Sequence, residues 1–171
     1  MITLYLARHG ETVDNARQVM QGQTQGELNA EGQRQAEELA KKLAAEHFDV
    51  IMSSDLRRAK QTAEILARQY GLDVVTTPLL RERDWGDFTG RFIPDLRGEK
   101  WPDNVEPLEQ MMTRASRFLE LMRTNYDGQR VLAVGHGIIN KAIQAVFFGK
   151  QMSEIEKMKN AEVRILDISH N

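Results

Sequence analysis

The sequence contains no cysteine, which excludes a disulfide framework, a thiolate metal site and a cysteine nucleophile. It also has no surplus of positive charge, since 23 Lys and Arg face 25 Asp and Glu. Proteins that hold nucleic acid by its phosphates usually carry such a surplus, so we expect no nucleic-acid partner. Proline is scarce, and 12 glycines with 4 prolines among 171 residues are typical of a globular chain rather than a disordered or fibrous one.

Long hydrophobic runs are missing as well. No apolar stretch approaches the roughly 18 residues of a membrane-spanning helix. The first apolar segment reaches Arg8 and His9 too early to be the core of a signal peptide. A length of 171 residues with 41% hydrophobic side chains suffices for one domain with a substantial core. We therefore expect a single cytoplasmic domain over residues 1–171, without membrane association.

Segments typical of strands and helices alternate along the chain. Apolar runs rich in strand-forming residues predict strands over residues 2–7, 49–52, 72–77, 130–134 and 163–168. Strands that alternate with helices are typical of a parallel sheet between helical layers. We therefore predict an α/β fold, a three-layer α/β/α sandwich around a mostly parallel central sheet.

Helices are predicted where apolar residues recur every three or four positions. The predicted helices are residues 30–47 behind the N-cap Asn29, a segment that starts after Ser54 or Asp55, a long segment that starts at Asp103 or Asn104, and residues 137–148. Ser153 and Glu156 have the spacing of a capping box. Residues 10–28 and 78–102 show no clear period, so we expect irregular structure there, which in long segments is commonly functional.

Three predicted strands end in residues suited to binding an anion. Arg8 and His9 follow the first strand, a segment with two arginines (53–59) follows the second, and His136 follows the fourth. Ligands of open α/β sheets lie beyond the carboxyl ends of the strands. We therefore expect two histidines and at least two arginines to meet at one edge of the sheet.

This set of residues favours a phosphate group. Arginine stays charged and its forked N–H groups match phosphate oxygens, while Gly137 opens a predicted helix whose free N–H groups attract negative charge. Positive charge nearby lowers the pKa of a histidine, which keeps its imidazole neutral and nucleophilic. A second histidine could then stabilise the transferring group, and a carboxyl group could protonate the leaving oxygen.

Simpler interpretations of the same residues stay open at this point. A histidine at a strand end can merely cap backbone carbonyls, and Arg57 with Arg58 can form a solvated helix face. His47 and His170 are expected at the surface, at the end of a helix and beside the terminus. Two histidines without a closely spaced third histidine or carboxylate disfavour a metal site.

Five segments carry a more specific signal, namely LARHGETVDN (6–15), LNAEGQRQAEELAKKL (28–43), SSDLRRAKQTAEIL (53–66), LLRERDWGDFTG (79–90) and VLAVGHGIINKAI (131–143). Together and in this order they resemble the motifs of the histidine phosphatase superfamily, in its phosphoglycerate mutase-like branch. The resemblance covers nearly the whole chain. It implies the phosphoglycerate mutase-like fold and phosphoryl-transfer chemistry that needs neither metal nor cofactor.

The resemblance also implies roles for individual residues. His9 would be the nucleophile that forms a phosphohistidine. Arg8, Arg58 and His136 would bind and stabilise the phosphoryl group, with the α-helix N-terminus at Gly137 beside them. Arg58 is preferred to its neighbour because the pocket arginine of the family directly precedes alanine.

The remaining implied site residues are a carboxyl group and an amide. Glu82 would protonate the leaving alcohol and later activate water, a role that rests on the resemblance alone, and Asn15 would line the same pocket. Thr89 and Ile138 depart from the family pattern, and residues 103–106 replace a Gly-Glu-Ser turn. These departures concern the substrate side more than the phosphate pocket.

Three functions are compatible with these motifs. A mutase must exclude water from its phosphorylated intermediate, and family mutases have a long insertion between the acid and the second histidine and a closing C-terminal tail. Here 53 residues separate Glu82 from His136, and the chain ends soon after its last strand. We therefore favour a phosphatase, with a mutase as the alternative. A non-catalytic phosphate-binding module is a third possibility, which the presence of His9, Glu82 and His136 disfavours.

The substrate is expected to be a small phosphorylated metabolite, such as a sugar phosphate or a cobalamin-precursor phosphate. Five cations within the irregular segment allow two interpretations. They bind a second anionic group of the substrate, or they pair with nearby acidic residues on a solvated face. These cations are Arg81, Arg83, Arg91, Arg97 and Lys100. Aromatic side chains of the same segment wall the pocket or only pack the loop; they are Trp85, Phe88, Phe92 and Trp101.

Overall fold

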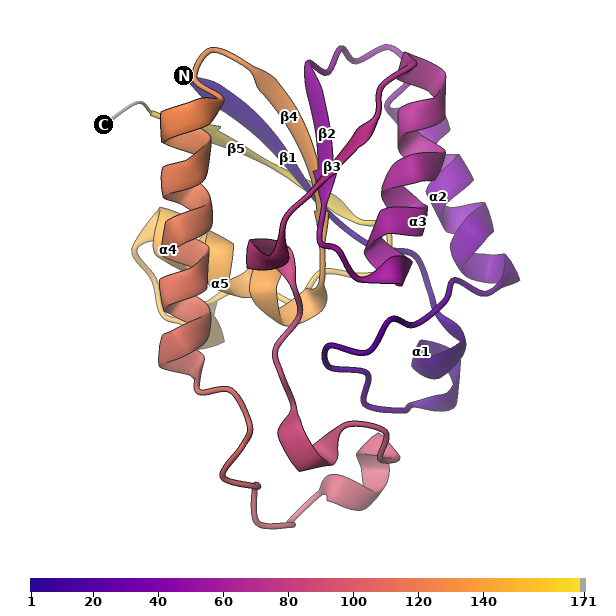
Figure 1. The fold of residues 1–171 in the computed structure, drawn as a ribbon, viewed down its shortest axis with the longest axis vertical. Coiled ribbons are helices and arrows are strands. Elements are labelled where there is room, and N and C mark those ends of the chain that lie inside the picture. Colours follow the sequence, from indigo (N-terminus) through magenta and orange to yellow (C-terminus); the bar gives the residue numbers. More distant parts are fainter. Residues whose placement is uncertain (170–171) are drawn as a thin grey trace.

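A five-stranded sheet in the order β3-β2-β4-β1-β5 lies at the centre of the structure, a computed structural model that describes residues 1–169 (Figure 1). Its strands are β1 (Ile2–Arg8), β2 (Val50–Ser53), β3 (Val74–Thr76), β4 (Arg130–Gly135) and β5 (Val163–Ile168). The first four run parallel and β5 runs antiparallel to β1. The predicted mostly parallel sheet is therefore confirmed.

Helices cover both faces of this sheet (Figure 1). The helices α2 (Ala30–Lys42) and α3 (Arg57–Ala67) lie on one face, and α4 (Leu108–Asn125) and α5 (Gly137–Phe148) lie on the other. The α/β/α sandwich is thus confirmed. The short helix α1 (Val13–Arg17) lies beyond the carboxyl end of β1.

Two apolar cores form because successive strand residues point to opposite faces. Leu4 and Leu6 of β1 belong to the cluster that also contains the α4 residue Phe118. Tyr5 and Ala7 belong to the other cluster, with the helices α2 and α3. Alternate residues of β1 therefore pack against the two helical layers, one set on each face of the sheet.

The start of α3 differs from the prediction. The helix begins at Arg57, and Leu56 occupies the N-cap without a side-chain hydrogen bond. Asp55 is instead paired with Arg81, whose Nε and Nη2 donate to its two carboxylate oxygens at 2.7 and 2.6 Å. Ser54 contacts a histidine of the site described below, so both predicted caps serve tertiary contacts.

The start of α4 also differs, because the helix begins at Leu108 after Pro107 rather than at Asp103 or Asn104. Asn104 instead exchanges two hydrogen bonds with Asp87, each at 3.0 Å. Its side chain accepts from the Asp87 N–H and donates to the Asp87 carboxylate. These hydrogen bonds hold residue 104 against the irregular segment, and the chain becomes helical only after Pro107.

Three further local features differ from the prediction: a short helix, the end of a helix and a capping box. Residues 10–28 contain α1, which Thr12 and Asn15 cap reciprocally at 2.9 and 3.1 Å. The helix α2 ends at Lys42 rather than 47, because the following residues turn into β2 and Arg130 donates to the His47 carbonyl at 2.8 Å. The second capping box joins residues 151 and 154, not 153 and 156. His47 is exposed as expected, and His170 lies outside the described residues.

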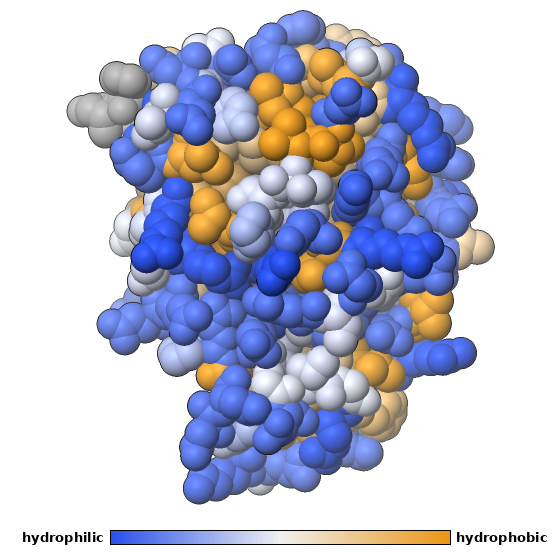
Figure 2. All heavy atoms as spheres, viewed as in Figure 1, coloured by the Kyte–Doolittle hydropathy of each residue, from blue (hydrophilic) through white to orange (hydrophobic). Residues whose placement is uncertain are grey.

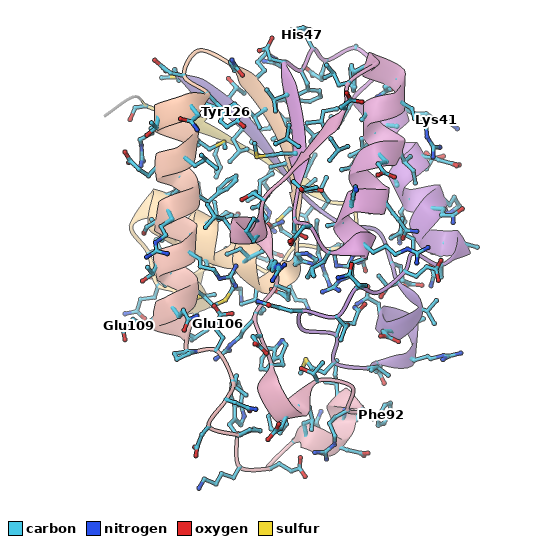
Figure 3. All side chains as sticks on the ribbon, viewed as in Figure 1. Lys41, His47, Phe92, Glu106, Glu109 and Tyr126 are labelled. Carbon is cyan, nitrogen blue, oxygen red and sulfur yellow. The ribbon has the colours of Figure 1, made fainter. Side chains whose placement is uncertain are left out.

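The predicted irregular segment 78–102 is confirmed, but it extends to residue 106 and projects beyond the carboxyl ends of the strands (Figure 1). It contains three short 3-10 turns, at Pro78–Leu80, Gly86–Phe88 and Ile93–Leu96. Figure 3 shows Phe92 in this projection and Glu106 at the foot of α4. Hydrophilic residues cover most of its surface in the view of Figure 2, while Phe88, Leu96 and Val105 form a small apolar cluster inside it.

Candidate active site

His9 lies directly after β1 and is almost fully buried, with 2% of its surface exposed. Its Nδ1 lies 2.7 Å from the carbonyl oxygen of Gly10. A carbonyl oxygen can only accept a hydrogen bond, so Nδ1 carries the hydrogen of the neutral ring. The Nε2 atom is therefore left with a free lone pair.

The loop that carries His9 is packed tightly against α2. A Cβ atom at Gly10 would lie 2.5 Å from the Gly32 carbonyl oxygen, and a Cβ atom at Gly32 would lie 1.9 Å from the Glu11 carbonyl oxygen. No side chain fits at either position. The Gly10 N–H also donates to the Thr62 hydroxyl of α3 at 3.1 Å, so two helices hold the loop.

The electrostatic surroundings keep His9 neutral. Burial lowers the pKa of His9 well below its usual range, and the positive charges of Arg58 and Arg8 lower it further. The hydrogen bond to Gly10 opposes this shift only in part. The sequence-based expectation of a neutral imidazole beside arginines agrees with this direction.

Arg58 comes from the first turn of α3 and is 1% exposed. Its Nη2 donates to the Gly22 carbonyl at 2.7 Å, and its Nη1 donates to the Thr24 carbonyl at 2.5 Å. Burial lowers the pKa of Arg58 to about 10, which leaves it positively charged at neutral pH. Arg57, by contrast, faces outward and pairs with Glu27 at 3.4 Å, with 58% of its side chain exposed. The structure therefore distinguishes the two arginines in the predicted sense.

His136 and Gly137 follow β4, so that Gly137 opens α5. The rings of His9 and His136 lie with their centroids 5.0 Å apart. Burial, and then the charge of Arg58, lower the pKa of His136 well below its usual range, so this ring is also neutral. A Cβ atom at Gly137 would lie 3.6 Å from the Arg8 guanidinium carbon and 3.7 Å from a Glu82 carboxylate oxygen, which places Gly137 between these two groups.

Arg8 ends β1 and donates from Nη1 to the Met158 carbonyl at 2.8 Å. Its pKa is lowered by burial, against the opposing charge of Glu82. Three buried nitrogen atoms of this region have no hydrogen-bond partner among the described residues: Arg8 Nε, Arg58 Nε and His136 Nδ1. Buried donors are normally satisfied. Two of these atoms, Arg8 Nε and Arg58 Nε, are donors of arginines that line one cavity with His9. They therefore indicate a site for a group rich in acceptors.

Glu82 faces this cluster from the irregular segment. Its carboxylate oxygens accept hydrogen bonds from the backbone N–H groups of Ile138 and Ile139, all at 3.1 Å, at the N-terminus of α5. The Arg83 N–H also donates to it, at 2.9 Å. The partial positive charge of a helix N-terminus attracts carboxylates, so α5 orients Glu82 next to Gly137.

A buried ion pair anchors the segment that carries Glu82, and sequence reasoning missed it. Arg114 of α4 donates to both carboxylate oxygens of Glu106 at 3.0 Å and to the Arg81 carbonyl at 2.8 Å. Glu106 in turn accepts from the Asp84 N–H at 2.9 Å. Glu106 occupies the last position of the segment 103–106, where the family's turn was missing, and thus supplies an anchor there.

A cavity of about 270 Å³ opens in front of His9. Asn15 lines it, and its amide oxygen is already used by the Thr12 N–H, so its NH₂ group is the part available to a ligand. The outer wall is mostly apolar, with one cation; its residues are Val19, Met20, Trp85, Ile93, Ile138 and Lys157. Arg8, Arg58, Glu82 and Gly137 also line the cavity. The predicted site residue His136 does not line it, because it is fully buried next to His9.

The cations proposed for a second anionic group are mostly engaged elsewhere. Arg81 pairs with Asp55, and Arg91 pairs with Glu99 at 3.1 Å. Arg83 stacks over Trp85 and Trp101 at 4.7 and 5.1 Å. A neighbouring cavity of about 450 Å³ contains Arg97, Phe88 and Trp101, whereas Lys100 lines neither cavity.

Lys157 is the cation that sequence reasoning missed. It is exposed, lines the cavity and forms no ion pair with another described residue. It lies outside every motif, in the segment after α5. Hydrogen bonds of Met158 with Arg8 and of Asn160 with His9 bring that segment to the site. No local pattern could have indicated it.

The described residues contain neither a metal-binding cluster nor a membrane-spanning helix. No group of three or more His, Asp or Glu side chains within residues 1–169 could hold a metal ion. In the same part of the chain, no helix has the length and apolar character that crossing a membrane requires.

Comparison with known proteins relates the whole site to one superfamily. The family model of the histidine phosphatase superfamily (branch 1) matches residues 4–171. The uncharacterized phosphatase PhoE of Bacillus subtilis (strain 168) is 38% identical over 141 residues, which cover 80% of this chain and 72% of PhoE. The probable phosphoglycerate mutase GpmB of Escherichia coli (strain K12 / DH10B) is 33% identical over 163 residues, covering 87% and 76%.

A solved structure of high similarity is that of the mycobacterial glucosyl-3-phosphoglycerate phosphatase in complex with VO3. It superposes with a TM-score of 0.87 at 28% identity and covers 96% of this chain and 92% of that one. Both phosphatases and a mutase are therefore similar to this chain over most of its length.

Proposed function

The chain belongs to the histidine phosphatase superfamily (branch 1), and we propose that it hydrolyses a small phosphomonoester through a phosphohistidine on His9, without a metal ion or cofactor. Membership makes it a phosphatase or a mutase. One observation carries the proposal: His9, whose Nε2 has a free lone pair, lines one cavity with Arg8 and Arg58, whose buried Nε–H groups lack a partner among the described residues. Hydrolysis, the residue roles and the metal independence are our inference.

In the first step, His9 Nε2 attacks the phosphorus atom, and the bond from phosphorus to the ester oxygen breaks. Arg8, Arg58 and His136 stabilise the charge that develops on the phosphoryl oxygens. Asn15 binds the same group with its NH₂. Glu82 acts as the general acid and gives a proton to the leaving alcohol.

In the second step, water attacks the phosphohistidine and the bond between phosphorus and Nε2 breaks. Glu82, now a carboxylate, takes a proton from the attacking water. Inorganic phosphate leaves and His9 is neutral again. The burial and the positive charges that lower the pKa of His9 support this cycle, since they keep the ring ready for the next attack.

Water access favours the phosphatase over the mutase. A mutase must keep water from the phosphohistidine until the phosphoryl group returns to the product. The rim of the cavity is exposed instead, at Lys157 and at Ile93, which is 45% exposed. The similarity to GpmB keeps mutase activity as the alternative. A binding module without catalysis would need neither Glu82 nor the free His9 Nε2.

The test is phosphate release from a panel of phosphomonoesters, including 3-phosphoglycerate and sugar phosphates, in EDTA. His9→Ala serves as the blank. We expect release by the wild type and loss of at least 1000-fold in the blank, because the blank lacks the proposed nucleophile. Formation of 2-phosphoglycerate with 2,3-bisphosphoglycerate, without phosphate release, would instead establish the mutase. Release that persists in His9→Ala would contradict the proposed nucleophile.

A further inference from the structure

Ser54 makes a buried contact to which the function proposed above assigns no role. It follows β2 directly and has no exposed surface. Its hydroxyl oxygen lies 2.6 Å from Nε2 of His136, a residue 82 positions away. Such a short contact between two fully buried groups restricts which of them can donate the hydrogen bond.

The hydrogen atoms around Ser54 can be assigned one by one. The backbone N–H of Leu56 donates to the Ser54 oxygen at 3.3 Å, so this oxygen already accepts one hydrogen bond. A hydroxyl group has one hydrogen to give, and no other acceptor for it is recorded among the described residues. If the Ser54 hydroxyl donates to His136 Nε2, the Ser54 hydrogen has an acceptor, whereas in the opposite arrangement it has none among the described residues. We assign the first arrangement, in which Nε2 is the unprotonated nitrogen.

The opposite nitrogen of the ring completes the assignment. A neutral imidazole carries a single hydrogen, so His136 carries it on Nδ1. That atom is buried and has no partner among the described residues. The lowered pKa of His136 agrees with a neutral ring.

We propose that Ser54 is a positioning residue that fixes His136 in the Nδ1–H form, so that this ring meets the transferring phosphoryl group as a hydrogen-bond donor. The proposal rests on the function proposed above, because it concerns transfer to His9. The two histidines then carry their hydrogen on the same nitrogen but use opposite ends of the ring. The Gly10 carbonyl leaves His9 with a lone pair for attack, and the Ser54 hydroxyl leaves His136 with an N–H for stabilisation.

The first measurement is the ¹⁵N spectrum of the histidine rings, which distinguishes the two neutral forms directly. The chain has four histidines, so His9→Ala and His136→Gln suffice to assign the two site rings. We expect His136 as the Nδ1–H form in the wild type and a mixture of both forms in Ser54→Ala. Ser53→Ala is the matched control, because Ser53 is equally buried but donates to the Ser54 carbonyl at 2.8 Å. It should leave the His136 signals unchanged.

The second measurement separates kcat from KM. A donor that acts on the transferring group stabilises the transition state, so Ser54→Ala should lower kcat by about 10- to 100-fold and change KM less than threefold. Inhibition by vanadate should weaken along with kcat. Ser54→Cys, nearly the same size but with a weak donor, should give an intermediate kcat and keeps the test valid if the alanine variant does not fold.

Two results would overturn the proposal: an unchanged Nδ1–H signal of His136 in Ser54→Ala, or a kcat of that variant within twofold of Ser53→Ala. The spectrum does not depend on turnover. If the wild type released no phosphate but the spectra changed as expected, the hydrolytic function would fail while the assignment of Ser54 to His136 would stand.

Discussion

The two sides of the candidate active site are built differently. The side proposed to bind the phosphoryl group, called the phosphoryl side below, consists of residues at the ends of parallel strands and in the first turns of helices. Its residues His9, Arg58 and His136 are each at most 2% exposed. The side proposed to face the leaving group consists largely of the projecting segment 78–106, where Phe92 and Trp101 are 44% and 51% exposed. Figure 1 shows that the segment lies outside the sandwich.

The rigid side is suited to holding catalytic groups in place, and the projecting side is suited to determining which substrate binds. A group at the end of a buried strand moves only if the sheet moves, so its distances are held by both apolar cores. The projecting segment is held by a few polar anchors, such as Glu106 with Arg114 and Asn104 with Asp87. Loops on a rigid scaffold tolerate change and commonly carry specificity. Substitutions on the phosphoryl side should therefore lower activity toward every ester, whereas substitutions on the other side should change activity by an amount that depends on the ester.

The largest effect is expected on the phosphoryl side, at Arg58. Arg58→Ala should lower kcat/KM at least 1000-fold, because it removes a buried donor and charge from the transition state. Arg57→Ala, the matched control, changes an exposed residue paired with Glu27 and should stay within twofold. Steady-state kinetics of both variants decide the matter, and a larger loss in Arg57→Ala would reverse the assignment of the pocket arginine.

Glu82 joins the two sides, so its effect should depend on the leaving group. Glu82→Gln should lower kcat/KM about 100-fold for an alkyl phosphate, whose alcohol needs a proton, and only a few-fold for p-nitrophenyl phosphate. The ratio of the two rates is the readout. Equal losses for both esters would show that Glu82 does not act as the acid.

Acid should weaken the phosphoryl side through its two neutral histidines. Their pKa values are lowered in the folded chain, whereas unfolded histidine titrates near about 6.5. Below that pH the unfolded state binds protons that the folded state does not. The free energy of unfolding therefore decreases as the pH decreases. The slope reaches about 1.4 kcal/mol per pH unit for each histidine. Urea unfolding at pH 7.5, 6.5 and 5.5 measures it, and His136→Gln should show a flatter dependence; equal slopes would contradict the neutral assignment.

The smallest effect is expected at Lys157 on the rim. Lys157→Ala should lower kcat/KM about three- to fivefold for esters with a second anionic group, as an exposed charge contributes little. It should leave p-nitrophenyl phosphate unchanged. Lys159→Ala, an exposed neighbour that does not line the cavity, is the control. A similar loss for both esters would place Lys157 on the phosphoryl side instead.

Some features of the molecule could be predicted from short segments. The strand β1 and the helix α5 were predicted closely because their apolar periodicity is decided within a few residues. The helix starts at Arg57 and Leu108 were not, because the side chains expected to cap them bind partners far along the sequence. Capping residues such as Asp and Asn serve either purpose equally well.

The sequence by itself determined the alternation of strands and helices, the two histidine motifs and, through the resemblance, the candidate roles of Arg58 and Glu82. Only the tertiary structure decided which nitrogen of His9 is free, that Ser54 contacts His136, that Glu106 and Arg114 anchor the acid, and that Lys157 reaches the cavity. Periodicity and motifs are local, whereas hydrogen-bond partners and electric fields depend on residues brought together across the fold.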